Sequence, residues 1–311
     1  MILYALIHHS FKKAFGHRYD GAAVFPYWRA KDLGLEEERF HFTSQHGWEL
    51  SGSRYYVKDK EFKGLIVFFH GLGDGRASYI YSIALLAKQG YLVYAYDNTG
   101  CMESQGNQIY SLEHTLIDQK YFFSWLEKDP KAQGLRRFAV GHSWGGYGAC
   151  VSAKKEYKIE KVVDIAGFNS VLDSSLTNFP AWGKLLKPWV WLNLKMASGK
   201  YGNTKAVNVL SKSKAKVLYI VGKDDRMVTL KEGYEPIYKA FKDNKRFKFI
   251  VKEGRGHSVY KDKDAETYVV KLLKDGINSL TLDHNIEMDL VRATKEEKGV
   301  WEQIYQFLEE D

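Results

Sequence analysis

Short apolar runs and amphipathic stretches alternate along most of this chain. The run Gly-Leu-Ile-Val-Phe-Phe at 64–69 is typical of a strand that is covered on both faces of a sheet. On this criterion we predict strands at 40–44, 48–57, 64–70, 91–96, 137–142, 161–166, 216–221 and 247–252. Apolar positions at helical spacing predict helices at 77–89, 112–128, 230–241, 266–273 and 295–309, and a further helix directly after residue 143.

The order of these elements predicts the fold class, α/β. After residue 64 strands and helices alternate, which is the pattern of a mainly parallel sheet with helices on both faces. The first two strands, joined by a turn at 45–47, are expected to form an antiparallel N-terminal strand pair. The chain has 311 residues, 45% of them hydrophobic, and we expect one domain over residues 1–311.

Three segments do not fit the alternation. Residues 1–37 are expected to form a helical leader that ends in the charged run at 36–39, and the stretch after residue 257 is an elaborated C-terminus. Residues 170–213 show no strand pattern, so we predict a helical cap insertion over the carboxyl edge of the sheet. The cap contains three tryptophans that either line a substrate pocket or seal the cap against the body: Trp182, Trp189 and Trp191.

The formal charge of +8 changes this picture little. The lysines are scattered, and no zinc-finger or RNA-binding signature accompanies them, so we expect a solvated surface and no nucleic-acid partner. A weak attraction to anionic membranes or other polyanions stays open. No apolar run approaches membrane-spanning length, and Cys101 and Cys150 make no disulfide framework. We therefore expect a soluble, cytoplasmic protein with no stable membrane insertion.

The pentapeptide Gly-His-Ser-Trp-Gly at 141–145 is the strongest chemical signal in the chain. It lies at the end of a predicted strand and leads into small, helix-compatible residues. A serine on such a sharp turn stands clear of the sheet, and side chains two residues away would collide, so both flanks are glycine. The pattern predicts a nucleophile elbow with Ser143 as the nucleophile.

A serine hydroxyl needs a base within hydrogen-bond distance and an acid that orients this base. In open parallel sheets such groups lie on loops beyond the carboxyl ends of strands. Of ten histidines, only His257 follows a late strand in a glycine-rich loop. Asp225, after the strand at 216–221, is the expected acid, with Asp224 as the alternative. The order Ser143, Asp225, His257 is the one expected for this type of elbow.

Acyl chemistry at a serine also requires an oxyanion hole of backbone N–H donors. One donor is expected from Trp144, the residue after the nucleophile. The other is expected from Leu72, in the loop His-Gly-Leu-Gly at 70–73, because its glycines let the backbone turn toward a substrate. His70 and His142 are interpreted as structural residues, since neither has the position of a base.

Together these motifs resemble the α/β-hydrolase superfamily, and more narrowly its monoacylglycerol-lipase-like and serine-aminopeptidase-like branch of serine hydrolases. The likeness rests on the loop at 70–73, the elbow at 141–145, the acidic turn at 222–228 and the sequence Gly-His-Ser at 256–258. The loop at 97–106 is also similar, although Thr99 and Met102 replace the arginine and glycine usual there. The resemblance runs from about residue 40 to residue 260, plus the final helix, and implies the α/β-hydrolase fold.

We predict an ester hydrolase, carboxylesterase-like or lipase-like, in which Ser143 attacks the acyl carbonyl and His257 takes its proton. Peptidase, thioesterase and acyltransferase activities use the same residues, and a catalytically silent ligand-binding protein is a further alternative. No metal or organic cofactor is required, and no spacing of His, Asp and Glu predicts a metal site. The expected partner is a small-molecule ester with an apolar acyl group, and the sequence leaves the oligomeric state open.

Overall fold

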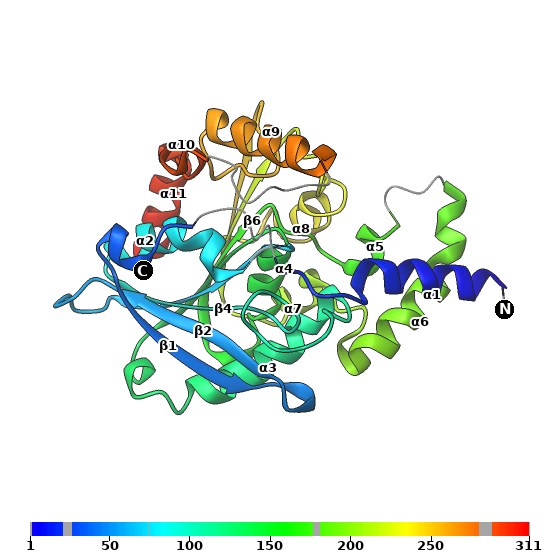
Figure 1. The fold of residues 1–311 in the computed structure, drawn as a ribbon, viewed down its shortest axis with the longest axis horizontal. Coiled ribbons are helices and arrows are strands. Elements are labelled where there is room, and N and C mark those ends of the chain that lie inside the picture. Colours follow the sequence, from blue (N-terminus) through cyan, green and yellow to red (C-terminus); the bar gives the residue numbers. More distant parts are fainter. Residues whose placement is uncertain (1, 21–26, 74, 177–180, 280–287, 311) are drawn as a thin grey trace.

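The computed structural model describes residues 2–20, 27–73, 75–176, 181–279 and 288–310. An eight-stranded sheet runs through the molecule in the order β1-β2-β4-β3-β5-β6-β7-β8 (Figure 1). Its strands are β1 (Glu36–Thr43), β2 (Glu49–Tyr56), β3 (Gly64–Phe69), β4 (Tyr91–Tyr96), β5 (Arg137–His142), β6 (Ile159–Ile165), β7 (Lys216–Gly222) and β8 (Phe247–Lys252). The pairs that contain β2 are antiparallel and the others are parallel, so the predicted fold class is confirmed.

Helices cover both faces of this sheet. The described α-helices are α1 (Ile2–Phe15), α2 (Ile80–Lys88), α3 (Thr115–Leu126), α4 (Trp144–Val151), α5 (Val171–Ser174), α6 (Lys187–Ser198), α7 (Ala206–Leu210), α8 (Tyr234–Phe241), α9 (Lys263–Ser279), α10 (Leu290–Ala293) and α11 (Lys298–Glu309). Short 3₁₀ turns are η1 (Ala30–Leu33), η2 (Gln45–Gly47), η3 (Arg76–Tyr79), η4 (Leu112–His114), η5 (Pro130–Ala132), η6 (Lys155–Tyr157), η7 (Ala181–Leu186) and η8 (Gly199–Tyr201). The core on one face includes residues of α3, α4, α7 and α8, and the core on the other includes residues of α2 and α11.

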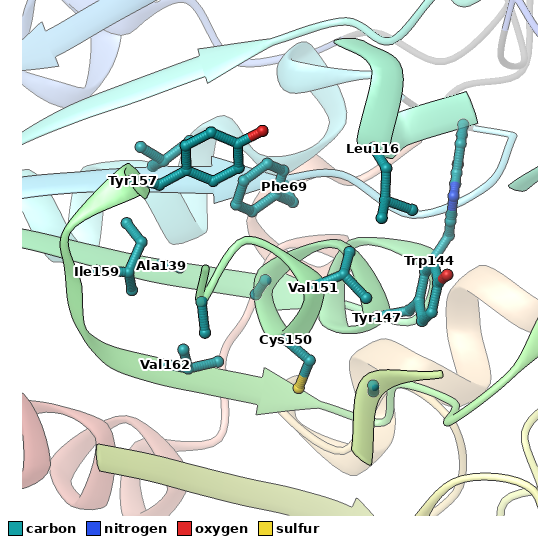
Figure 2. Close-up of a cluster of buried hydrophobic side chains, with 14 of the residues drawn as sticks. Phe69, Leu116, Ala139, Trp144, Tyr147, Cys150, Val151, Tyr157, Ile159 and Val162 are labelled. Atoms are coloured by element: carbon teal, nitrogen blue, oxygen red, sulfur yellow. The ribbon is translucent and has the colours of Figure 1, made fainter. Parts of the chain in front are cut away.

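Helix α4 follows β5 directly and is enclosed on all sides, since each of its eight residues is buried. Figure 2 shows Cys150 and Val151 of this helix in one buried cluster with Ala139 of β5 and Val162 of β6. Three glycines and an alanine among its residues let the helix lie close to the sheet. This packing of α4 against the sheet fixes the position of the turn between β5 and α4.

The N-terminal segment differs from the expected helical leader. Helix α1 ends at Phe15, and the charged run at 36–39 lies in β1 instead of ending a helix. The strand tolerates two of these charges because β2 pairs with them: Ser53 Oγ donates to Glu37 at 2.7 Å, and Arg54 Nε donates to Glu38 at 2.8 Å. Residues 21–26 of the predicted leader lie outside the described residues.

The segment between β6 and β7 contains helices α5, α6 and α7 in its described part, while residues 177–180 of the predicted cap lie outside it. Helix α6 lies beside α1 at one end of the molecule (Figure 1). The single-domain organisation with a leader and a cap stays a prediction. None of the described helices combines the length and the hydrophobicity needed to cross a bilayer.

Candidate active site

The turn between β5 and α4 holds Ser143 in a strained backbone conformation, with φ 57° and ψ −119°. Its N–H donates to the carbonyl oxygen of Ile165 at 2.8 Å, which ties the turn to β6. A Cβ atom at Gly145 would collide with the carbonyl oxygen of Phe69, and one at Gly141 would collide with the carbonyl oxygen of Gly145. The two glycines of the pentapeptide are therefore needed for this backbone path.

Asp225 and His257 meet across the ends of β7 and β8. His257 Nδ1 lies 2.7 Å from Asp225 Oδ2, and the other carboxylate oxygen accepts the N–H groups of Met227 and Val228 at 2.8 and 2.9 Å. The Asp225 side chain is 0% exposed and that of His257 is 12% exposed. Because the carboxylate only accepts, Nδ1 of the imidazole carries the proton and Nε2 keeps a free lone pair. Asp224, the alternative acid, is exposed.

The structure brings two of the three predicted catalytic side chains into direct contact. No hydrogen bond between Ser143 Oγ and the imidazole of His257 is among those of the described residues. The two residues are nevertheless on adjacent segments, because the ring of His142 lies 4.7 Å from the ring of His257, centroid to centroid. Proton transfer from the Ser143 hydroxyl to His257 remains part of the proposal below.

His142, which precedes the serine, links the loops around it. The N–H of Gly71 donates to the Tyr79 hydroxyl at 3.2 Å, and this hydroxyl lies 2.9 Å from His142 Nδ1. His142 Nε2 lies 3.1 Å from the carbonyl oxygen of His257. A carbonyl only accepts, so Nε2 carries the proton and Nδ1 accepts from the tyrosine. Burial lowers the pKa of His142 well below its ordinary value, so this imidazole stays neutral.

The two predicted oxyanion donors lie on the loop after β3 and at the first residue of α4. Leu72 is 37% exposed, whereas Trp144 is buried and its indole N–H donates to the carbonyl oxygen of Leu112 at 2.8 Å. Within the described chain, neither Leu72 nor Trp144 has a hydrogen-bond acceptor for its backbone N–H. The N-terminus of α4 also carries the positive end of the helix dipole, which favours negative charge at this position.

The loop at 97–106 accommodates Thr99 and Met102, which replace the arginine and glycine usual in the related family. Met102 has a φ of 43°, so it takes the left-handed conformation that glycine usually provides, at a cost of about 1 kcal/mol. The guanidinium of Arg18 donates to the carbonyl oxygen of Met102 at 2.8 Å and supports this conformation. Thr99 donates its N–H and its hydroxyl to Asp118 at 2.8 and 2.7 Å. The contacts of Arg18 and Asp118 therefore hold this loop in place without an arginine at position 99.

The C-terminal stretch anchors the loop that carries His257, a role the sequence did not reveal. Arg255 Nη1 donates to Glu297 at 3.0 Å, and its other terminal nitrogen lies 3.7 Å from Glu266. Glu266 also accepts the N–H of Ser258 at 3.0 Å. These carboxylates come from α9 and the residue before α11, so the signal in the sequence is limited to an arginine two residues before the histidine.

The three cap tryptophans lie at the surface. Trp182, Trp189 and Trp191 are 57%, 37% and 42% exposed. Their role in a substrate pocket, or in a seal between cap and body, stays a prediction. A cavity of about 520 Å³ lies elsewhere, at the C-terminal end of α4, and its lining includes Lys154 and Lys205 but none of the predicted catalytic residues.

In the part of the chain that the structure describes, no group of three or more His, Cys, Asp or Glu side chains could hold a metal ion.

Comparison with known proteins places this chain in a family. The family model described as serine aminopeptidase, S33, matches residues 60–217, just over half of the chain. The chain belongs to this family. It is therefore a serine hydrolase of the α/β-hydrolase superfamily. The matched range includes Ser143 and the loop after β3 but ends before Asp225 and His257. No curated protein sequence matches this member of the family.

Solved structures show the fold of this S33 family member in both esterases and peptidases. An esterase of Pyrococcus furiosus has a TM-score of 0.60 and 19% identity, over 85% of this chain and 97% of its own. An acylaminoacyl peptidase of Pyrococcus horikoshii has a TM-score of 0.53 and 20% identity, over 72% of this chain and 38% of its own. Dipeptidyl peptidase 4 of Porphyromonas gingivalis has a TM-score of 0.54 and 17% identity, over 78% and 35%. At these identities the likeness concerns the fold alone.

Proposed function

We propose that this hydrolase cleaves carboxylic esters of small molecules through Ser143, His257 and Asp225. The observation that carries the proposal is the hydrogen bond between His257 Nδ1 and a buried, doubly anchored Asp225, next to a strained serine turn. A buried carboxylate that fixes one imidazole tautomer leaves the other nitrogen available as a base. No metal or organic cofactor is needed for this chemistry.

In the proposed reaction Ser143 Oγ attacks the acyl carbonyl carbon while His257 Nε2 takes the hydroxyl proton. The backbone N–H groups of Leu72 and Trp144 donate to the oxyanion that forms. The imidazolium then gives its proton to the leaving alkoxide, and an acyl group remains on the serine. Water attacks this ester, its proton passes to His257, and the acid leaves as the serine recovers its proton.

The charge of the cap favours esters over peptides with a free amino terminus. An aminopeptidase must bind a substrate ammonium, for which a carboxylate is the usual partner. Between Asp173 and Asp224 the sequence contains no Asp or Glu. Within the predicted cap at 170–213 the carboxylate is that of Asp173, and Lys187 and Lys205 already pair with it, each at 2.9 Å. The cap therefore offers such a substrate no further carboxylate. We propose an uncharged ester with an apolar acyl group, and a cytoplasmic location, with which the two buried free thiols agree.

A peptidase is the second candidate, because the matching family is described as serine aminopeptidase. The two candidates use the same nucleophile and differ in the leaving group. Their difference is therefore a matter of relative rates, which one substrate panel can measure.

The test is a panel of p-nitrophenyl esters of increasing acyl length and of aminoacyl p-nitroanilides, run with the wild type and Ser143→Ala. We expect ester cleavage that exceeds anilide cleavage, and a loss of at least about a thousandfold in the variant. Circular dichroism checks that the variant is folded. Faster anilide than ester cleavage would favour the peptidase, and undiminished turnover by Ser143→Ala would remove the serine from the mechanism.

A further inference from the structure

Helices α1 and α6, with the turn η7, present large apolar side chains to solvent at one end of the molecule. Eleven large apolar side chains of the described residues are exposed, and six of them lie on these elements. They are Leu6, Trp182, Leu185, Trp189, Trp191 and Met196, with exposures of 61%, 57%, 76%, 37%, 42% and 64%. We call this surface the α1–α6 face. Contiguous exposed apolar surface of this kind marks an interaction site.

The two helices are packed together, so their exposed side chains lie at the same end of the molecule. The ring of Tyr4 lies 6.0 Å from that of Trp189, and the Tyr4 hydroxyl donates to the sulfur of Met196 at 3.3 Å. His8 Nδ1 lies 2.6 Å from the side-chain oxygen of Asn193. Figure 1 shows α1 and α6 side by side, away from the sheet, with the helix α9 on another side of the molecule. The face therefore projects from the body.

The same elements carry positive charge and no negative charge. The sequence contains no Asp or Glu at 1–19 or at 174–223. The lysines of α1, η7 and α6 include Lys12, Lys13, Lys184 and Lys195, and Lys200 follows α6 in η8. Lys195 Nζ lies 5.9 Å from the ring centre of Trp191, so one ammonium group lies directly against the exposed indole. Lys187 shares the carboxylate of Asp173 with Lys205, each at 2.9 Å.

We propose that the α1–α6 face binds the surface of a membrane that contains anionic lipids. Tryptophans settle at the boundary between headgroups and acyl chains, leucines and methionine enter the acyl region, and lysines stay with the anionic headgroups. The helices then lie in the plane of the membrane and do not cross it. This binding does not depend on the proposed ester hydrolysis.

Two other occupants fit the face less well. A second copy of the same face would bring lysines against lysines, with no carboxylate on these elements to pair with them. A nucleic acid would satisfy the lysines through its phosphates but would leave the leucines and the methionine without a partner. An anionic bilayer satisfies the charge and the apolar side chains at once.

The first test measures cosedimentation of the full chain with phosphatidylcholine vesicles and with vesicles to which phosphatidylglycerol is added. We expect binding to the anionic vesicles that is at least about tenfold tighter and that weakens with added salt. Tryptophan emission should shift to shorter wavelength on binding. A chain that does not bind the anionic vesicles at low ionic strength would overturn the proposal.

The apolar contribution is tested with the double variant Leu6→Ser and Leu185→Ser, whose side chains are exposed, so the fold should be retained. We expect at least about tenfold weaker vesicle binding. The matched control is Val270→Ser with Val291→Ser, at side chains that are 45% and 70% exposed on α9 and α10. Equal binding by both double variants and the wild type would contradict a specific face.

The charge contribution is tested with Lys184→Glu and Lys195→Glu together, against the control pair Lys239→Glu and Lys242→Glu at α8. The first pair should lose binding to anionic vesicles, and the second should lose markedly less. Light scattering of the free protein completes the experiment. Suppose that the protein does not bind vesicles but forms a dimer, and that the Leu6→Ser, Leu185→Ser double variant is a monomer. This result would assign the face to a second copy of the chain and overturn the proposal.

Discussion

At the scale of single residues, the acid of the site is distinguished from its neighbour by hydrogen bonds. Asp225 accepts the N–H groups of Met227 and Val228 with one oxygen and faces His257 with the other, whereas Asp224 is exposed. The turn after β7 thus orients one carboxylate inward. The geometry of this turn therefore gives the adjacent residues Asp224 and Asp225 different environments.

Asp225→Asn should lower kcat by about a thousandfold to ten-thousandfold, while Asp224→Asn should change it less than about twofold. The two backbone N–H donors hold the amide oxygen of the new asparagine, so its NH₂ group faces His257 Nδ1. The imidazole must then carry its proton on Nε2, where the base is needed. Steady-state kinetics on one p-nitrophenyl ester measure both variants, and the opposite ranking would move the acid to Asp224.

At the scale of elements, His142 and Tyr79 connect the loops that follow β3, β5 and β8. The bonds run from the Gly71 N–H through the tyrosine hydroxyl and the neutral imidazole to the carbonyl oxygen of His257. The loop of the expected oxyanion donor and the loop of the expected base are thus positioned by one hydrogen-bonded chain. The histidine before the nucleophile is a positioning residue in this account.

Tyr79→Phe should reduce kcat about tenfold to a hundredfold with little change in KM, because it leaves the Gly71 N–H and His142 Nδ1 without partners. The matched control is Tyr238→Phe at an exposed ring of α8, which should behave as the wild type. Kinetics and a thermal unfolding curve separate positioning from folding. A variant with wild-type kcat would show that this chain of bonds does not position the site.

Much of the fold could be predicted from the sequence, because its signals are local. The strands at 91–96, 137–142 and 247–252 are confirmed to the residue, since apolar runs end at turn residues there. The predicted start of β1, at residue 40, was wrong. Consecutive charged residues such as Glu37 and Glu38 are typical of a surface helix, and the sequence does not show that β2 pairs with them. Contacts such as Arg255 with Glu297 join residues far apart in the chain, and no local pattern contains them.

At the scale of the whole molecule, buried carboxyls couple stability to pH. Burial raises the pKa of Glu113 to about 7, although its oxygens accept the N–H of Asn203 and the hydroxyl of Ser111, each at 3.1 Å. Burial likewise raises the pKa of Asp164 to about 7. A carboxyl whose folded pKa is raised binds more protons in the native state. Its stabilising contribution is complete below its unfolded value and is lost as the pH rises through about 7.

Glu113→Gln should remove one such contribution to the pH dependence. Between about pH 5.5 and pH 8.5 the wild type should lose about 2 kcal/mol of unfolding free energy more than the variant does. Urea unfolding at both pH values measures the difference. The exposed Glu235→Gln serves as the control and should follow the wild type. Parallel pH dependence in all three proteins would show that Glu113 is ionised at little cost.

The central claim is that Ser143 is a nucleophile activated by His257, and covalent labelling tests it most directly. The wild type is treated with a fluorophosphonate, and the modified peptide is identified by mass spectrometry. We predict a single adduct on Ser143, no adduct in Ser143→Ala, and labelling at least about a hundredfold slower in His257→Ala. An adduct on another serine, or labelling of His257→Ala at the wild-type rate, would contradict the account.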